Sequence, residues 1–187
     1  MTYAMLNADQ ILQFGSDDDS VALAPVGTKL PTSLTEIAPA FKEVGWLNED
    51  GMGFTPSDSV DKRKGHQGHR VYRTVMTDSS TDFKFTALQS NYQTLALQWN
   101  VKEVKTASGV TTATLSNARD VDAFAIVIRA YANGHSYLWA CSRFEVGERD
   151  EMTLSATDDT AYAITGTFAA DVVFITDDPA YIAEASA

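Results

Sequence analysis

Apolar and polar residues alternate with a period of two along much of the chain, most clearly in its second half, and this pattern predicts β-strands. The segments are short and rich in β-branched and aromatic residues. They cover residues 21–26, 70–77, 82–86, 110–115, 123–132, 135–146, 153–156, 162–168 and 171–176. About eight or nine strands would occupy roughly half of the chain, well above the usual strand fraction.

Turn residues suggest how some strands are joined. Asn133-Gly134 predicts a tight hairpin, because a type I′ turn needs positive φ at both central residues and these two tolerate it. Residues 78–81 (Asp-Ser-Ser-Thr) predict a second hairpin between strands 70–77 and 82–86. Pro25 cannot donate a backbone hydrogen bond, which favours an edge position for strand 21–26.

Either face of strand 70–77 could point toward the core. Alternation places Arg70, Tyr72, Thr74 and Met76 on one side, and Val71, Arg73 and Val75 on the other. We expect Val71 and Val75 to face the core.

Two short helices are expected. Ser33 and Glu36 have the spacing of a capping box, followed by apolar residues that share one helical face; Pro39 limits this helix and Gly45 would end it. Asn91 can cap a second helix. Its shared face would carry Tyr92, Leu95, Ala96 and Trp99. The end of the chain, residues 179–187, reads as a short helix or a frayed tail.

The predicted fold class is mainly β, a β-sandwich or partly open barrel with one or two short flanking helices, in a single domain of residues 1–187. Two segments fall outside the strand pattern. Residues 1–20 read as an N-terminal arm, and residues 48–69 as a long polar loop rich in glycine. Loops of this length in compact domains are often functional.

Composition narrows the function. The chain has 187 residues, 44% of them hydrophobic, and a formal net charge of −11. This charge argues against a protein that grips DNA through its phosphates. No apolar run reaches the roughly 20 residues of a membrane span, and the first residues do not resemble a signal peptide. Cys141, in an apolar run, is expected to be a buried, inert thiol.

Residues with catalytic or metal-binding chemistry do not form a convincing motif. His66 and His69, with Asp58 or Asp61, could be imagined around a metal, but no helix fixes the pair and no further ligand completes a tetrahedral set. The acidic run 17–19 lacks the spacing of a calcium loop. No nucleophile elbow, phosphate loop or dinucleotide fingerprint occurs. We therefore expect no catalytic residue, no cofactor and no bound metal.

Several segments carry a resemblance to a known family. They include Ala24-Pro-Val-Gly-Thr-Lys-Leu-Pro31, Ala40-Phe-Lys-Glu-Val-Gly-Trp-Leu47, Glu49-Asp-Gly51, Arg70-Val-Tyr-Arg-Thr-Val75 and Asn91-Tyr-Gln-Thr-Leu95. In this order they resemble the major tail proteins of siphophages that infect actinobacteria. The resemblance covers nearly the whole chain and is closest over residues 22–99. Where the family often has a Trp-Gln pair before the first long strand, this chain keeps only Gln67.

The resemblance implies a structural protein of the virion, assembled in the host cytoplasm. Such subunits form hexameric rings in which their strands join a barrel around a lumen. The implied partners are further copies of the chain, a tape-measure protein, and tail terminator and distal tail proteins; DNA would pass through the lumen without specific binding. Given the acidic balance, we expect the lumen to be net acidic or neutral.

Segment 48–69 is predicted to make the contacts between rings. The residues assigned to this interface are Asp58, Asp61, Lys62, Arg63, Lys64, His66, Gln67 and His69. The short basic cluster 62–64 also has a simpler interpretation, as a salt-bridged surface loop.

Other functions remain open at the level of sequence. A β-sandwich binding module could use Trp46, Trp99 and Trp139 to hold a sugar or peptide, although the strand and helix positions of the last two favour the core. A tail terminator or baseplate ring protein would share the fold.

Overall fold

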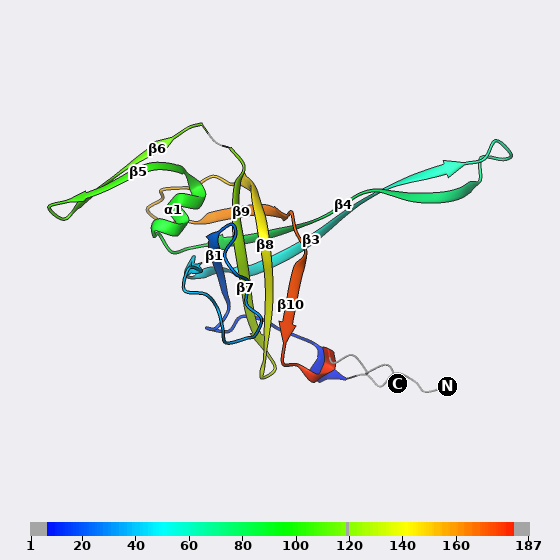
Figure 1. Cartoon of the computed structure of the whole chain (residues 1–187), viewed down its shortest axis with the longest axis horizontal. Helices are drawn as coiled ribbons and strands as arrows, with labels where there is room; N and C mark the ends of the chain where they lie inside the picture. The colour runs from blue at the N-terminus through cyan, green and yellow to red at the C-terminus, as the bar shows by residue number, and fades with distance from the viewer. Residues whose placement is uncertain (1–6, 119, 182–187) are drawn as a thin grey trace.

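The computed structural model describes residues 7–118 and 120–181 (Figure 1). Its body is an eight-stranded antiparallel sheet in the order β2-β1-β7-β8-β9-β4-β3, with β10 paired to β8. The strands are β1 (Ser20–Pro25), β2 (Lys42–Glu43), β3 (Leu47–Lys64), β4 (Val71–Ala87), β7 (Asp122–Ala132), β8 (His135–Arg149), β9 (Tyr162–Phe168) and β10 (Val172–Thr176). Strands β5 (Asn100–Ala107) and β6 (Val110–Ser116) form a separate hairpin after helix α1 (Tyr92–Gln98), and short 3-10 turns cover Ala8–Gln10 and Pro179–Tyr181.

The first and last strands of the sheet path, β2 and β3, are neighbours in sequence. Only Val44, Gly45 and Trp46 separate them, and such a link spans at most about 14 Å. The sheet must therefore curl until its two edges approach each other. The backbone N–H of Val44 donates to Val21 O (3.0 Å) on one side, and that of Leu88 donates to Trp46 O (2.8 Å) on the other. The result is a partly open barrel, as predicted.

The core fills the inside of this curl. Its buried side chains come from strands at both ends of the sheet path and from α1, and they include Val21, Leu23, Val44, Phe83, Phe85, Leu97, Ile126, Ile128, Phe144 and Ile164. A second cluster covers the other face of β1, β7 and β8, where residues 30–41 pack on Ala125, Val127 and Leu138. Burial on both faces explains the nearly continuous apolar run of β7.

Strand β8 is the centre of the sheet. Its first half pairs with β10 from Tyr137 to Cys141, and its second half pairs with β9 from Phe144 onward. The partner changes at residues 142–143, where Ala169 N–H donates to Arg143 O (2.9 Å). Strand β4 pairs with β3 along nearly its whole length, and with β9 over residues 82–87. Among the described strands, none lies along the outer edge of β10.

Many of the predicted strands are confirmed. Residues 162–168 match β9 in full, and segments 21–26, 110–115, 123–132, 135–146 and 171–176 differ from the observed strands mainly at their ends. The turn at Asn133 and Gly134 has φ of 52° and 86°, as expected for its type. Cys141 is buried and free. Pro25 lies at the end of β1 that extends past the two-residue pairing with β2.

The predicted helix after Ser33 is wrong. Ser33 Oγ accepts a hydrogen bond from Glu36 N–H (3.2 Å), as a cap would, but no helical turn follows. Leu34 and Ile37 instead pack against the outer face of the sheet, in an irregular segment that ends at β2. Tertiary burial and Pro39 outweigh the local helical spacing. Segment 153–156, predicted as a strand, is also irregular.

Helix α1 is confirmed, but its buried face is not the predicted one. Asn91 accepts from Thr94 N–H (3.0 Å), and the Thr94 hydroxyl accepts from Asn91 N–H (2.9 Å), which completes a capping box. Thr94, Leu97 and Gln98 are buried, whereas Tyr92 is 57% exposed. The cap fixes the start of the helix, and the barrel decides which side faces inward.

The predicted loop 48–69 is the largest correction. Most of it belongs to β3, which pairs with β4 from Leu47 to Lys64; only residues 65–70 form the turn. Residues 78–81, predicted as a turn, lie inside β4. The sequence gives no strand signal here because the distal part of this hairpin is exposed on both faces and needs no apolar alternation.

Gly45 is expected to be required for barrel closure. Its φ is +95°, and an added Cβ would lie 1.8 Å from Gln89 Oε1. Gly45→Ala should lower the free energy of unfolding by about 1–2 kcal/mol or more, because L-residues are strained at positive φ. Gly53→Ala is the matched control, since its Cβ would meet nothing within 4 Å. Urea denaturation of both variants measures the difference; equal stability would contradict this role.

Candidate assembly surfaces

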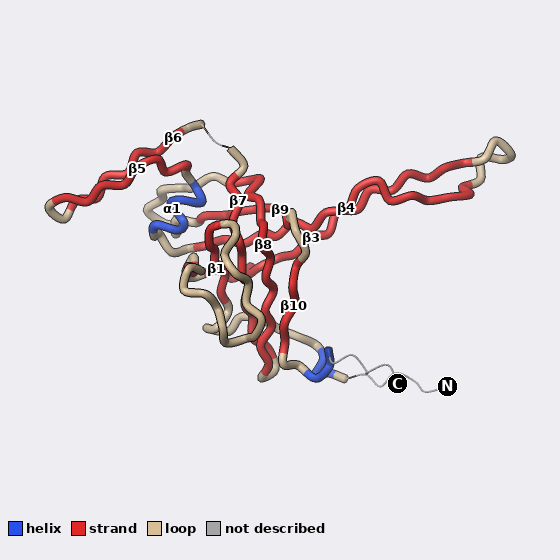
Figure 2. The backbone as a smooth tube through the Cα atoms, in the orientation of Figure 1, coloured by secondary structure: helices blue, strands red, loops and turns tan. Residues whose placement is uncertain are grey.

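The distal part of the β3–β4 hairpin, residues 56–81, projects from the barrel as a two-stranded ribbon, here called the long arm (Figures 1 and 2). Its last contact with the sheet is at Asp82, which pairs with Thr55 of β3 and Thr167 of β9. Beyond that point nine residues of β3, about 30 Å of strand, have only β4 as a neighbour. Two-stranded ribbons alone are marginally stable in water.

The long arm carries every residue assigned to the assembly interface. Asp58, Asp61, Lys62, Arg63 and Lys64 lie on its β3 strand, and His66, Gln67 and His69 form its tip; all are exposed. Asp58 Oδ1 accepts from Ser79 Oγ (2.7 Å), and Arg63 Nε lies 3.9 Å from Asp61 Oδ2. The structure therefore brings these residues together on one projecting element.

Val71 and Val75 do not face the core, contrary to expectation. They lie on the long arm, where Val71 is 48% exposed, and Tyr72 on the opposite side is 70% exposed. A ribbon without a second layer has no inner face. Its apolar side chains are available for another surface.

Strands β5 and β6 form a second, shorter ribbon, here called the short arm (Figure 1). Its turn at Ser108-Gly109 has positive φ at both residues, the geometry of a tight hairpin. Val104 and Val110 are exposed by 41% and 66%. The sequence predicted β6 but missed β5, which alternates poorly and begins directly after α1.

The free edge of β10 is unusually apolar. Val172, Val173 and Phe174 are each exposed by about two fifths (38%, 44% and 38%). Phe174 also packs on Trp139, with ring centroids 5.2 Å apart, and on Tyr181 at 5.3 Å. An apolar strand edge of this kind is an aggregation site unless another chain covers it.

Both ends of the described chain meet at Tyr137. From the N-terminal segment, Phe14 contacts the Tyr137 ring edge-to-face, with centroids 5.6 Å apart. From the C-terminal segment, the Tyr137 hydroxyl donates to Asp178 Oδ2 (2.5 Å) and Tyr181 packs against the ring. Ile11, Phe14 and Asp19 therefore contact the barrel. The first six residues of the predicted arm and residues 182–187 fall outside the described part.

The same contacts shift two pKa values. Burial, and then the hydrogen bond to Asp178, raises the pKa of Tyr137 to about 12. The hydrogen bonds from Tyr137 and from the Ala180 backbone lower the pKa of Asp178. Both shifts favour a protonated tyrosine that donates to an ionised carboxylate.

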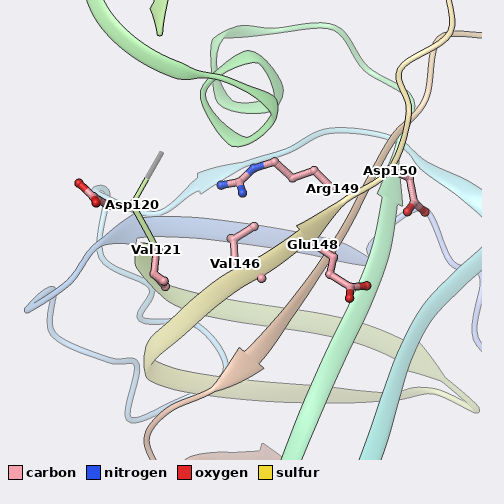
Figure 3. A pocket seen from close by; sticks show the side chains of 7 residues that line it. Asp120, Val121, Val146, Glu148, Arg149 and Asp150 are labelled. Carbon is pink, nitrogen blue, oxygen red and sulfur yellow. The ribbon is translucent and has the colours of Figure 1, made fainter. Parts of the chain in front are cut away.

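One open depression is lined by carboxylates that do not converge on a common point (Figure 3). It has a volume of about 630 Å³ and lies where β7 begins and β8 ends, and Figure 3 shows the Asp120, Glu148 and Asp150 side chains pointing in different directions. Arg149 is held by Leu97 O (2.5 Å from Nε) and by the carboxylate of Asp122. The arginine fastens the end of α1 to the barrel.

Metal and membrane elements are not found in the described residues. Over residues 7–118 and 120–181, no three His, Cys, Asp or Glu side chains are placed to hold a metal ion. No helix in this part of the chain is long and apolar enough to cross a membrane. Of the three tryptophans considered for ligand binding, Trp139 packs between Phe54 and Phe174, and only Trp46 is highly exposed, at 75%.

Comparison with known families decides the assignment. The profile of a family described as phage tail tube proteins matches residues 5–184. The chain belongs to this family of phage tail tube proteins. It is accordingly a structural protein of the phage tail, as the sequence resemblance implied.

Solved structures with a related shape come from gene transfer agent (GTA) particles. One is the tail of an empty GTA particle refined helically with C6 symmetry: 10% identity, TM-score 0.48, covering 86% of this tail tube protein and 97% of that chain. Another is the virion of a native GTA particle: 8% identity, TM-score 0.45, with the same coverage. No curated protein sequence matches the chain significantly.

Tyr137 gives the tail tube protein a testable pH dependence. Because its pKa is raised in the folded state, the free energy of unfolding should hold below about pH 10 and fall as the pH rises toward 12. Tyr137→Phe should remove this part of the fall. Urea denaturation at pH 8 and pH 11 measures it, with the exposed Tyr72→Phe as control. The same pH dependence in both variants would contradict the assignment.

Proposed function

We propose that six copies of the chain pair their sheet edges into a closed ring and that rings stack through the long arm into the tail tube. The observation that carries this proposal is the set of surfaces left without a neighbour in a single subunit. They are the apolar β10 edge, the short arm and the long arm. The number six follows from the resemblance to siphophage major tail proteins.

Ring closure is assigned to β10. Its backbone groups along one edge have no strand partner in the described chain, and its side chains there are apolar. Pairing with a strand of the neighbouring subunit would satisfy the backbone and bury these side chains.

Ring stacking is assigned to the long arm. It reaches about 30 Å beyond the barrel. Its charged residues, Lys62, Arg63 and Lys64 among them, face outward. A second ring would give the exposed ribbon the packing partner that it lacks in the monomer.

The remaining parts of the proposal concern what passes through the tube. DNA moves through the lumen without specific binding, and the lumen is net acidic or neutral, in keeping with the net charge of −11. A tape-measure protein fills the lumen during assembly, and tail terminator and distal tail proteins cap the ends. No enzymatic activity is proposed. A structure of the assembled tube with a strongly basic lumen would refute the charge assignment.

Removing the long arm tests the stacking role. Residues 56–81 are replaced by Asn-Gly, which joins Thr55 to its partner Asp82 through a type I′ turn and keeps the pairing of β4 with β9. The subunit should fold with nearly unchanged thermal stability, and tube formation should drop at least tenfold. Circular dichroism and negative-stain microscopy measure the two results. Tubes of normal length would contradict the stacking role.

Val173→Lys tests ring closure. A lysine on an edge strand blocks pairing with another strand without disturbing the fold, and Val173 is 44% exposed. Sedimentation should show monomers where the parent chain forms rings. Leu154→Lys is the control, because Leu154 is 82% exposed in a loop. Rings formed equally well by both variants would rule out the β10 edge.

A further inference from the structure

A groove of about 840 Å³ lies beside the link that closes the barrel. It runs between the turn at residues 15–20, the end of β2 and the start of β3. Its lining includes the acidic residues Asp17, Asp18, Asp19, Glu43 and Glu49, and one basic residue, Arg129. The function described so far uses none of these residues.

None of these five carboxylates forms a salt bridge within residues 7–118 and 120–181. Asp19 is occupied by hydrogen bonds, because it accepts from Gly15 N–H (2.8 Å) and from Tyr131 N–H (2.8 Å). The groove therefore carries several carboxylates that are not neutralised by salt bridges.

A buried hydroxyl in the groove is also unsatisfied. Ser20 is 9% exposed, lines the groove, and its Oγ has no hydrogen-bond partner among the described residues. The same holds for Oδ1 of Asn48, which lines the groove from β3. Leaving a buried polar group unpaired costs about 1–3 kcal/mol, so native proteins seldom do so without a reason. Both atoms can accept hydrogen bonds, which points to an occupant rich in donors.

The groove also has an aromatic anchor. Trp46 is 75% exposed although its backbone is fixed, with its N–H donating to Gln89 Oε1 (3.3 Å). Exposed tryptophans at the centre of an interface often carry much of its binding energy. An indole face also attracts lysine and arginine side chains.

The part of this chain with the matching chemistry is the outer end of the long arm, residues 60–73, here called the arm tip. Five of the 14 lysine and arginine residues lie there: Lys62, Arg63, Lys64, Arg70 and Arg73. The only acid among residues 60–73 is Asp61, which lies 3.9 Å from Arg63. The tip is thus strongly basic on a chain whose net charge is −11.

The tip and the groove of one subunit cannot meet. Leu47 to Met52, at the start of β3, line or border the groove, and Lys64, at the end of β3, belongs to the arm tip. A strand of 18 residues is about 60 Å long, which separates the two sites. Figure 1 shows the long arm pointing away from β1. A contact between two different surfaces of the same chain is heterologous, and such contacts repeat from copy to copy.

We infer that the groove is the receptor for the basic arm tip of a second copy of this chain. The inference rests on the proposed stacking of rings and specifies its docking site. Arginine and lysine side chains of the tip pair with Asp17, Asp18, Glu43 and Glu49. The indole of Trp46 packs against the ribbon.

Charge reversal tests the pairing. One variant carries Lys62→Glu and Lys64→Glu on the tip; the other carries Asp17→Lys and Glu49→Lys in the groove. Each alone should raise the protein concentration needed for tube formation at least tenfold. Mixing the two variants should restore tubes of alternating composition, and so should the chain with all four changes. Lys29→Glu with Lys84→Glu is the control for the tip variant, because both lysines are exposed and lie outside both arms and the β10 edge.

The outcomes separate this inference from the stacking role of the arm. Each variant must first match the parent subunit in circular dichroism and thermal unfolding; Glu49→Lys alone replaces the groove variant if that one does not fold. Tubes formed normally by a folded groove variant would overturn the receptor site, as would failure of both the mixture and the fourfold variant. In either case the arm truncation reports separately on whether the arm stacks rings at all.

Discussion

The link of Val44, Gly45 and Trp46 is the constraint on which the rest of the structure depends. It joins the two ends of the sheet path, so the sheet can exist only as a curled barrel. The curl lets side chains from β1 and β4 share one core, although three strands separate them along the sheet. Gly45 and Trp46 of this link also line the acidic groove. The closure of the barrel and the groove therefore share two residues.

The barrel buries its apolar side chains within one subunit, but the two arms and the β10 edge leave apolar side chains exposed. Both arms are two-stranded ribbons with exposed apolar side chains, and β10 ends the sheet with an apolar edge. In a single subunit these strand edges and ribbons lack the packing partners that would stabilise them. For a tail tube protein these exposed surfaces are useful, because burying their apolar side chains and pairing their free edges would stabilise the polymer. The opposite charges of the groove and the arm tip would then set the direction in which copies add.

Tyr137 links the two terminal segments of the described chain to the proposed ring-closing edge of β10. Phe14 and Tyr181 pack on its ring, and Asp178 binds its hydroxyl. Phe174 of the free edge stacks on the same ring. The terminal segments and the proposed ring-closing edge thus share one aromatic cluster, so that a change in one is felt by the other through direct packing.

The sequence by itself determined the elements that are marked by a turn or capping sequence, or by a run of buried apolar residues. The β7–β8 hairpin follows from an apolar run and Asn133-Gly134, α1 follows from its Asn91 cap, and the resemblance identified the tail tube family. The sequence predicted segment 48–69 to be a loop, which is wrong, and to make the contacts between rings, which stays a prediction. Only the tertiary structure decided that this segment is a strand, that Leu34 and Ile37 belong to a covering segment, and that Leu97 faces inward. The physical reason is that alternation records which residues are buried. A ribbon exposed on both faces need not alternate: the strands at 70–77 and 110–115 are still predicted from their β-branched residues, whereas the polar segment 48–64 is not. The buried faces of a helix or covering segment are decided by the barrel on which they pack.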